Sequence, residues 1–216
     1  QPAAASRRFP SYLAPAMTQL PELPLTLSRQ EIRKMIRQRR RALTPEQQQE
    51  MGQQAATRMM TYPPVVMAHT VAVFLSFDGE LDTQPLIEQL WRAGKRVYLP
   101  VLHPFSAGNL LFLNYHPQSE LVMNRLKIHE PKLDVRDVLP LSRLDVLITP
   151  LVAFDEYGQR LGMGGGFYDR TLQNWQHYKT QPVGYAHDCQ LVEKLPVEEW
   201  DIPLPAVVTP SKVWEW

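Results

Sequence analysis

The sequence predicts a layered α/β fold with a largely parallel central sheet. Short apolar runs typical of buried strands alternate with segments that carry apolar residues at helical spacing, as in strands joined by helices. The chain has 216 residues, which is enough to bury a sizeable core in one domain with an appended tail. A glycine-rich segment late in the chain lies between a strand pattern and a helix pattern, a position that suits anion binding.

The N-terminal segment 1–27 is predicted to be an irregular tail, and 28–216 to be the folded domain. The tail has no periodic apolar pattern, and prolines interrupt every candidate for the apolar core of a signal peptide. The prolines of the tail are Pro2, Pro10, Pro15, Pro21 and Pro24, and Pro15 and Pro21 are the two that interrupt these candidates. No apolar run approaches the roughly 20 residues that a membrane span needs, so no membrane partner is expected.

Two helices are predicted at the start of the domain, over 28–43 and 44–60. Each begins with a capping box, in which a hydroxyl side chain and the side chain three residues later satisfy each other's backbone N–H groups. The pairs are Ser28 with Glu31 and Thr44 with Gln47. The sequence Tyr62-Pro63-Pro64 is expected to end the second helix.

Strand and helix patterns then alternate along the rest of the domain. Two further helices are predicted over 83–93 and 167–175, and a looser stretch extends to Leu141. The predicted strands are 70–76, 96–102, 110–115, 145–149, 182–186 and 206–209.

The net charge of +1 hides an asymmetry along the chain. Residues 1–41 hold nine Lys or Arg against two Glu, which leaves 14 basic and 20 acidic residues in the remainder. This pattern is compatible with a solvated helix face, a nucleic-acid contact or a clamp on phosphates. Nucleic acid is not expected as a partner, because aromatic residues do not interleave with the arginines and the rest of the chain is acidic.

The segment from Arg160 to Arg170 contains four glycines within five residues, at 162 and 164–166. Without side chains, its backbone N–H groups can approach another molecule closely, and two flanking arginines suit a phosphate. The alternatives are a flexible turn and a close contact between a helix and a strand. The loop matches neither common nucleotide fingerprint, because no Lys follows Gly166 and Phe167 stands where a dinucleotide loop has its third glycine.

This segment resembles the signature of the 5-formyltetrahydrofolate cyclo-ligases, also called methenyltetrahydrofolate synthetases. The family carries Arg-Leu-Gly-x-Gly-x-Gly-x-Tyr-Asp after a Phe-Asp-x-x-Gly turn, and here these patterns occupy 160–169 and 154–158. The resemblance extends from about 28 to 209. It implies a three-layer α/β/α domain similar to the ribose-phosphate isomerase and CoA-transferase superfamily.

The resemblance also implies an activity. The expected protein is a cytoplasmic, monomeric ligase that uses ATP and Mg²⁺ to close 5-formyltetrahydrofolate to 5,10-methenyltetrahydrofolate, releasing ADP and phosphate. A phosphosugar- or CoA-handling enzyme on the same scaffold is the main alternative, and it would not consume ATP.

The resemblance implies four overlapping sets of site residues. The expected ATP-binding residues are Arg29, Arg33, Arg160, Leu161, Gly162, Met163, Gly164, Gly165, Gly166, Phe167 and Tyr168. The expected folate-binding residues are Leu75, Glu80, Met163, Gly164, Gly165, Gly166 and Phe167. The expected catalytic residues are Glu80, Arg160 and Tyr168, and the expected magnesium ligands are Asp169 and Asp201.

Taken alone, several of these residues would attract little notice. Glu80 would be interpreted as a carboxylate in a surface turn, although polar residues after a sheet strand often meet ligands. Arg29 and Arg33 share a helix face and would be interpreted as solvated charges. The other basic residues of that helix are expected to face solvent; they are Lys34, Arg37, Arg39, Arg40 and Arg41.

Three positions depart from the family pattern. Arg29 stands where many relatives carry Lys, which preserves the charge but changes hydrogen-bond geometry. Pro205 stands where relatives commonly have an Asp, and this weakens a metal site at the C-terminal turn. Leu126 replaces a common aromatic residue, so folate stacking is expected to use other rings, namely Phe77, Phe167 or Tyr168.

Cysteine and histidine add no site. Cys189 is the only cysteine, so no intramolecular disulfide can form and a reducing compartment is expected. A structural thiol is the simpler interpretation, because no partner for a nucleophile adjoins it. The six histidines show neither zinc spacing nor a nucleophile-elbow context, and we expect them to be structural or exposed.

Overall fold

The computed structural model describes residues 27–216, and a mixed eight-stranded sheet forms its centre. In spatial order the strands are β13 (Val213–Glu215), β12 (Ala206–Val208), β10 (Gln181–Tyr185), β7 (Val146–Thr149), β1 (Thr70–Ala72), β2 (Arg96–Leu102), β3 (Leu110–Tyr115) and β6 (Val138–Leu139). The strands from β12 to β2 run parallel, and antiparallel strands flank them at both edges. The predicted α/β class with a largely parallel sheet is confirmed.

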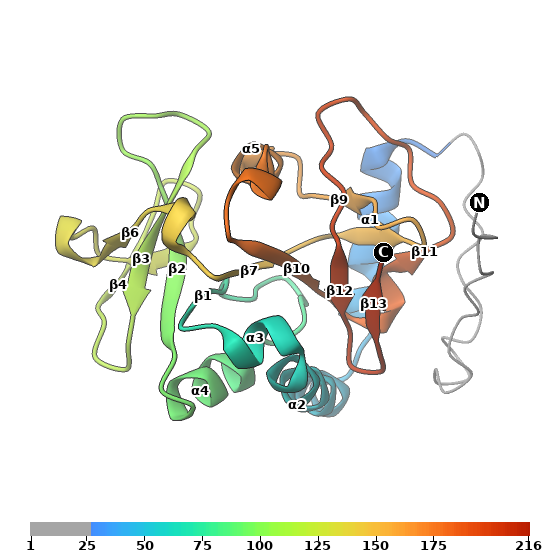
Figure 1. Ribbon diagram of the computed structural model, residues 1–216. Helices are drawn as coiled ribbons and strands as arrows, with labels where there is room; N and C mark the ends of the chain where they lie inside the picture. Colours follow the sequence, from blue (N-terminus) through green and yellow to red (C-terminus); the bar gives the residue numbers. More distant parts are fainter. Residues whose placement is uncertain (1–26) are drawn as a thin grey trace, which may run out of the picture.

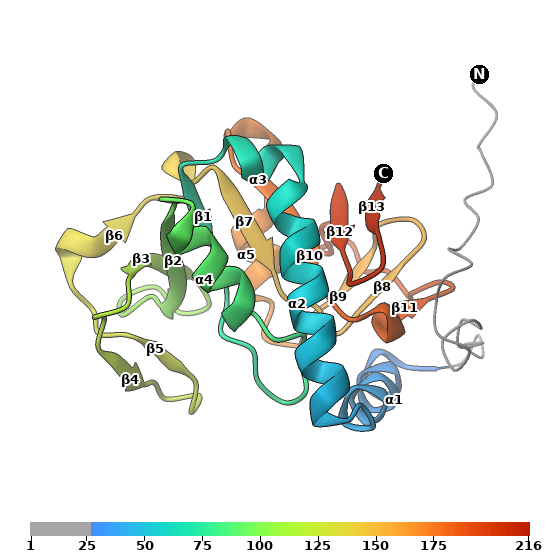
Figure 2. The same cartoon turned by 90° about the horizontal axis from the view of Figure 1, so that it is seen from below.

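Helices cover both faces of this sheet (Figure 1). The helices α2 (Pro45–Thr61), α3 (Pro63–Met67) and α4 (Gln84–Arg92) cover one face, and α5 (Phe167–Leu172) covers the other. In the view from below, α2 and α4 lie across the strands (Figure 2). Successive residues of β1 face opposite sides of the sheet. Val71 packs in the cluster with α2 and α4, and Ala72 packs in the cluster with α5.

A second, small sheet supports the helix α1 (Arg29–Arg41). It consists of β11 (Leu191–Val192), β8 (Ala153–Asp155) and β9 (Arg160–Leu161). Ile32 and Ile36 of α1 are buried in a cluster with side chains of these strands, and Leu27 packs against the same cluster. This packing places α1 beside β9, the strand that leads into the glycine-rich loop.

Locally encoded elements agree with the sequence predictions. Both capping boxes are present, with the Ser28 and Thr44 hydroxyl groups each accepting a hydrogen bond of 3.1 Å from the N–H three residues later. The strands β2 and β3 have the predicted bounds. The predicted irregular tail lies outside the described residues except for Leu27.

Other elements differ from the predictions. The strand predicted over 70–76 ends at Ala72. The helix predicted over 167–175 ends at Leu172, because Asn174 adopts a left-handed conformation with φ 61°. Pro63 and Pro64 start the short helix α3 as well as ending α2. The stretch predicted to be irregular contains β4 (Leu121–Met123), β5 (His129–Pro131) and β6.

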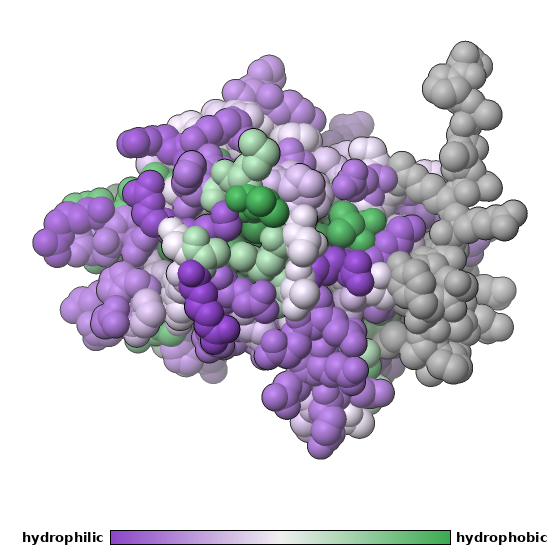
Figure 3. Space-filling model, turned by 60° about the horizontal axis from the view of Figure 1, so that its bottom comes forward, coloured by the Kyte–Doolittle hydropathy of each residue, from purple (hydrophilic) through white to green (hydrophobic). Residues whose placement is uncertain are grey.

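No helix among residues 27–216 is both long and apolar enough to span a membrane. On the face shown in Figure 3, apolar side chains gather near the middle and polar side chains surround them. The exposed large apolar residues include Phe77, Leu126 and Met163, which all line the cavity described below.

We predict that Gly184→Ala destabilises the sheet. A Cβ at this position of β10 would lie 2.8 Å from Cγ2 of Val207 and 2.9 Å from Cδ2 of Leu151, closer than packed carbon atoms approach. The expected loss is about 1–3 kcal/mol in the free energy of unfolding, measured by urea denaturation. Thr57→Ala, on the exposed surface of α2, is the control and should change stability by less than about 0.5 kcal/mol. Equal stability of Gly184→Ala and the wild type would contradict this packing.

Candidate active site

A cavity of about 310 Å³ opens at the carboxyl ends of the central strands. Its walls come from the segments that follow β1 and β7 and from the end of β2. The sheet order reverses between β1 and β7, since β2 continues the sheet on one side and β10 on the other. Open parallel sheets bind ligands in the crevice at such a switch point.

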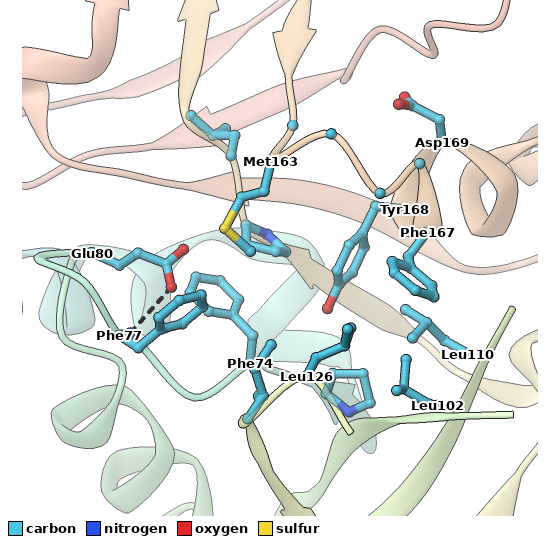
Figure 4. Close-up of a pocket in the computed structure, with 18 of the residues that line it drawn as sticks. Phe74, Phe77, Glu80, Leu102, Leu110, Leu126, Met163, Phe167, Tyr168 and Asp169 are labelled. Carbon is cyan, nitrogen blue, oxygen red and sulfur yellow. Dashed lines mark hydrogen bonds between the residues drawn. The ribbon is translucent and has the colours of Figure 1, made fainter. Parts of the chain in front are cut away.

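One end of the cavity is mainly apolar. Phe74 and Phe77 lie close to Glu80 (Figure 4), and Leu126 also lines the cavity. Of the rings expected to stack on a substrate, Phe77, Phe167 and Tyr168 all line the cavity, and Phe74 is an addition that the sequence did not single out. Flat aromatic side chains around one carboxyl group suit a planar, polar heterocycle.

Glu80 is the buried acid of this end. Its side chain reaches the cavity from the turn after β1, and only 8% of the residue is exposed. The N–H of Phe77 donates a 3.1 Å hydrogen bond to Oε1. Burial raises the pKa of Glu80 to about 7, although the Phe77 N–H and the Arg40 guanidinium oppose this rise. The carboxyl group therefore exchanges its proton near neutral pH.

The turn that carries Glu80 is attached to α1. Asp78 has φ 54° and accepts a 2.9 Å hydrogen bond from Nε of Arg41, and Nε of Arg37 lies 3.0 Å from its carboxylate. Arg40 is 2% exposed and its guanidinium lies 3.8 Å from Asp78. The prediction that these arginines face solvent is therefore wrong for Arg40. The turn packs closely over it, so that a Cβ on Gly79 would lie only 3.2 Å from Cβ of Arg40.

The other end of the cavity is formed by the glycine-rich loop and α1. Gly164 and Gly166 have φ values of 108° and 71°, a region that side-chain-bearing residues rarely adopt. Nε of Arg33 donates a 2.7 Å hydrogen bond to the carbonyl oxygen of Gly162. Arg29, Arg33 and the loop thus line one surface, as the predicted phosphate site requires.

Arg160 and Tyr168 lie between the loop and the sheet. Arg160 is 6% exposed, and its Nε donates a 2.8 Å hydrogen bond to the carbonyl oxygen of Pro150. Its guanidinium carbon lies 5.5 Å from the centre of the Tyr168 ring. The Tyr168 side chain points into the cavity (Figure 4), and burial raises its pKa, so its hydroxyl group stays protonated.

Arg170 does not line the cavity, although the sequence suggested that it flanks a phosphate. Its guanidinium donates to the carbonyl oxygens of Gly108 and Gly165 and lies 5.2 Å from the centre of the Phe167 ring. Arg170 therefore ties the glycine loop to the turn between β2 and β3.

The two predicted magnesium ligands differ in their surroundings. Asp169 lines the cavity, and its Oδ1 accepts a 3.3 Å hydrogen bond from the N–H of Ile202, while no described residue donates to Oδ2. Both oxygens of Asp201 are held by Arg29, at 2.7 and 3.1 Å. Pro205 offers no carboxylate, and residues 27–216 contain no group of three or more His, Cys, Asp and Glu that could hold a metal.

These surroundings fit Mg²⁺ at Asp169. Magnesium usually keeps several waters and takes one or two carboxylates together with substrate phosphates, so a single carboxylate beside a phosphate site suffices. Asp201, in contrast, is bound to Arg29 and does not line the cavity.

The cavity contains nearly all the predicted residues. Leu161 and Asp201 are the exceptions, and Leu161 is buried in the cluster under α1. Sequence analysis missed Gln30 and Trp200, which also line the cavity. Gln30 follows Arg29 and Trp200 precedes Asp201 in the sequence, and this proximity to predicted site residues could have pointed to both.

Cys189 and His187 are buried behind the turn that carries Glu80. Burial raises the pKa of the Cys189 thiol to about 11 and lowers the pKa of His187 to about 4. Nε2 of His187 lies 3.1 Å from the carbonyl oxygen of Gly79. Both side chains are therefore neutral near pH 7 and belong to the packing of the site.

Comparisons with known proteins agree with the geometry. A model of the 5-formyltetrahydrofolate cyclo-ligase family matches residues 26–210. A 5-formyltetrahydrofolate cyclo-ligase of Haemophilus influenzae is 53% identical over 83% of this chain and 96% of its own length. One of Mycolicibacterium smegmatis is 31% identical over 86% of this chain and 95% of its own length.

Solved structures give the same result. The NMR structure of Aquifex aeolicus 5,10-methenyltetrahydrofolate synthetase matches with a TM-score of 0.74 and 28% identity, over 87% of this chain and 92% of its own. The 5,10-methenyltetrahydrofolate synthetase of Mycoplasma pneumoniae shares the fold, with a TM-score of 0.67 at 21% identity, over 85% of this chain and 99% of its own.

We predict that burial of Glu80 makes folding pH-dependent. At pH values between 4.5, the ordinary pKa of the Glu80 carboxyl group, and about 7, the folded protein keeps a proton on Glu80 that the unfolded chain releases. The contribution of Glu80 is therefore most favourable below this window and is lost as pH rises through it, by up to about 3 kcal/mol. Urea unfolding at about pH 5 and pH 8 measures the effect, with Glu80→Gln as the control that stays neutral. A stability difference between the two proteins that does not change with pH would contradict the raised pKa.

Proposed function

This chain belongs to the 5-formyltetrahydrofolate cyclo-ligase family, and we propose that the cavity binds the pterin of the substrate at its apolar end and ATP at its glycine-rich end. The protein is an ATP-dependent ligase that closes 5-formyltetrahydrofolate to 5,10-methenyltetrahydrofolate, with release of ADP and phosphate. One observation carries the assignment of the residues: a single cavity joins a buried carboxyl group to a glycine loop with two arginines.

Glu80 is the group that recognises the pterin in this proposal. A carboxylate can accept two hydrogen bonds from the neighbouring N–H donors of a pterin ring, and a buried carboxylate rejects rings that lack them. Phe74 and Phe77 line the same end and offer faces for stacking. Because the pKa of Glu80 in the free protein is raised to about 7, binding of the N–H donors favours loss of its proton.

The glycine loop, Arg29 and Arg33 hold the phosphates in this proposal. Backbone N–H groups freed by Gly164 and Gly166 and two guanidinium groups match the oxygens of a triphosphate. Asp169 is the carboxylate placed to bind Mg²⁺, which would neutralise charge on the phosphates. Asp201 orients Arg29 through their paired hydrogen bonds.

The reaction needs positioning more than a protein nucleophile. The formyl oxygen attacks the γ-phosphorus of ATP, and ADP leaves. Nitrogen 10 then adds to the formyl carbon and loses its proton, and phosphate departs as the ring closes. Arg160 and Tyr168 both line the cavity, and we propose that the guanidinium and the protonated hydroxyl stabilise charge on the transferred phosphoryl group and the formyl oxygen.

We also propose a reducing, cytoplasmic setting for the protein. Its one cysteine is buried and cannot form a disulfide within the chain.

The direct test measures absorbance of methenyltetrahydrofolate formed from 5-formyltetrahydrofolate. Product should form with Mg-ATP and should not form without ATP. Product formation that ignores ATP, or no product at all, would refute the proposed function. A phosphosugar or CoA derivative converted without ATP would instead support the alternative enzyme class.

We predict that Glu80→Gln damages use of folate and spares use of ATP. Removing one charge-assisted hydrogen-bond acceptor should cost about 1.5–3 kcal/mol, which is about 10- to 150-fold in kcat/KM for 5-formyltetrahydrofolate. In the wild type, the KM for folate should fall as pH rises through about 7, because Glu80 becomes ionised, whereas Glu80→Gln should lack this dependence. An unchanged folate kcat/KM in the variant would remove Glu80 from the site.

We predict that Asp169→Asn weakens the binding of Mg²⁺, whereas Asp201→Asn weakens the binding of ATP. Asp169→Asn should raise the Mg²⁺ concentration needed for half-maximal rate at saturating ATP, because it weakens a direct ligand. Asp201→Asn should raise the KM for ATP about 10-fold or more and leave the Mg²⁺ requirement close to that of the wild type, because it releases Arg29. The same shift in Mg²⁺ requirement for both variants would show that Asp201 is also a ligand.

A further inference from the structure

We propose that Trp200 and Gln30 form the subsite for the adenine base of ATP, with the indole of Trp200 stacked on the base. This inference rests on the proposed function and extends it to the part of the nucleotide beyond the phosphates. Both residues line the cavity, and each is next in sequence to a member of the Arg29–Asp201 ion pair.

The exposure of Trp200 is unusual for so large an aromatic residue. It is 64% exposed, and among the described residues no hydrogen bond or ring contact involves its side chain. The other tryptophans are at least partly buried. For example, Trp91 donates a 2.9 Å hydrogen bond to the carbonyl oxygen of Tyr115, and Trp214 packs with its ring 6.0 Å from that of Phe154. An exposed indole on the wall of a cavity is a ready stacking surface.

The turn that carries Trp200 is fixed in place. The N–H of Asp201 donates a 3.1 Å hydrogen bond to the carbonyl oxygen of Glu198, and the N–H of Glu198 donates a 2.7 Å hydrogen bond to the Asp201 carboxylate. The same carboxylate holds Arg29. Trp200 is thus presented beside one of the proposed phosphate-binding arginines, at a position that the ion pair determines.

Gln30 completes the subsite from the side of α1. It is exposed, and it lies next to Arg29 in the sequence and one helical turn before Arg33. Its amide carries both a donor and an acceptor, which match the donor and acceptor on the exposed edge of adenine. In the proposed function, the folate occupies the part of the cavity around Glu80. An adenine base extending from the phosphates in that direction would therefore collide with the folate.

The test compares Trp200→Ala, Trp200→Phe and Gln30→Ala in the full chain. Stacking of a base on an aromatic side chain contributes about 1–3 kcal/mol, so Trp200→Ala should raise the KM and Kd for ATP about 5- to 150-fold. Trp200→Phe should stay within about 5-fold of the wild type, since a phenyl ring still stacks, and Gln30→Ala should lose about 2- to 10-fold. The KM for 5-formyltetrahydrofolate should not change in any of them.

Inorganic tripolyphosphate gives a second readout that a structural role would not produce. Because it has no base, its inhibition constant against ATP should be the same in the wild type and in Trp200→Ala. Phe105→Ala, which removes a residue that is 94% exposed and does not line the cavity, is the matched control and should leave the Kd for ATP unchanged.

Two results would overturn the subsite while leaving the proposed function intact. One is a wild-type Kd for ATP in Trp200→Ala. The other is an equal loss of affinity for ATP and tripolyphosphate, which would show that Trp200 acts only through Arg29. A wild-type protein that forms no product with ATP would instead refute the proposed function itself.

Discussion

The packing of α1 against the small sheet is the constraint on which the cavity depends. Ile32 and Ile36 are buried against residues of β8 and β9, and β9 leads directly into the glycine loop. With the apolar face of α1 fixed in this way, Arg33 reaches the loop and donates to the carbonyl oxygen of Gly162. These contacts fix the loop and Arg33 relative to each other, and in the proposed function this order would reduce the entropy that nucleotide binding must remove.

The same helix also organises the part of the cavity around Glu80. Its C-terminal half carries Arg37, Arg40 and Arg41, which surround Asp78 in the turn before Glu80. A buried carboxyl group without a cation nearby would stay protonated well above neutral pH. The Phe77 N–H and the Arg40 guanidinium oppose that effect and keep the pKa of Glu80 at about 7, where the N–H donors of the proposed substrate would be able to ionise it. The helix α1 thus fixes the position of the glycine loop through Arg33 and lowers the pKa of Glu80 through Arg40.

Sequence patterns predicted what is encoded locally. The capping boxes at Ser28 and Thr44 depend on residues three apart, and β2 and β3 are long enough to show an apolar pattern. Strands of two or three residues, such as β9 and β11, carry no periodic signal, because pairing with distant segments creates them. The glycine loop was predicted as an anion site from its own residues, whereas Glu80 and Asp169 were predicted through the resemblance. All of them line one cavity, and their roles are still predictions.

Contacts between distant segments explain what the sequence could not predict. The bond between Arg29 and Asp201 joins residues 172 positions apart, and the turn over Arg40 turned an apparently solvated arginine into a buried one. Trp200 showed no pattern of its own, because its exposure becomes meaningful only once the turn at 198–201 is docked on α1 through Asp201. Such information depends on tertiary structure.

Arg160 is a buried cation beneath the glycine loop. Its guanidinium lies under the loop, where a Cβ on Gly162 would come within 3.2 Å of it, so glycine at this position leaves room for the charge. The nearest carboxylate, that of Asp169, is 3.6 Å away, which is too long for a hydrogen bond. A buried cation that is incompletely neutralised raises the free energy of the empty site. In the proposed function, a phosphate bound to the loop above it would supply the missing negative charge, and part of the free energy of nucleotide binding would then come from relieving this buried charge.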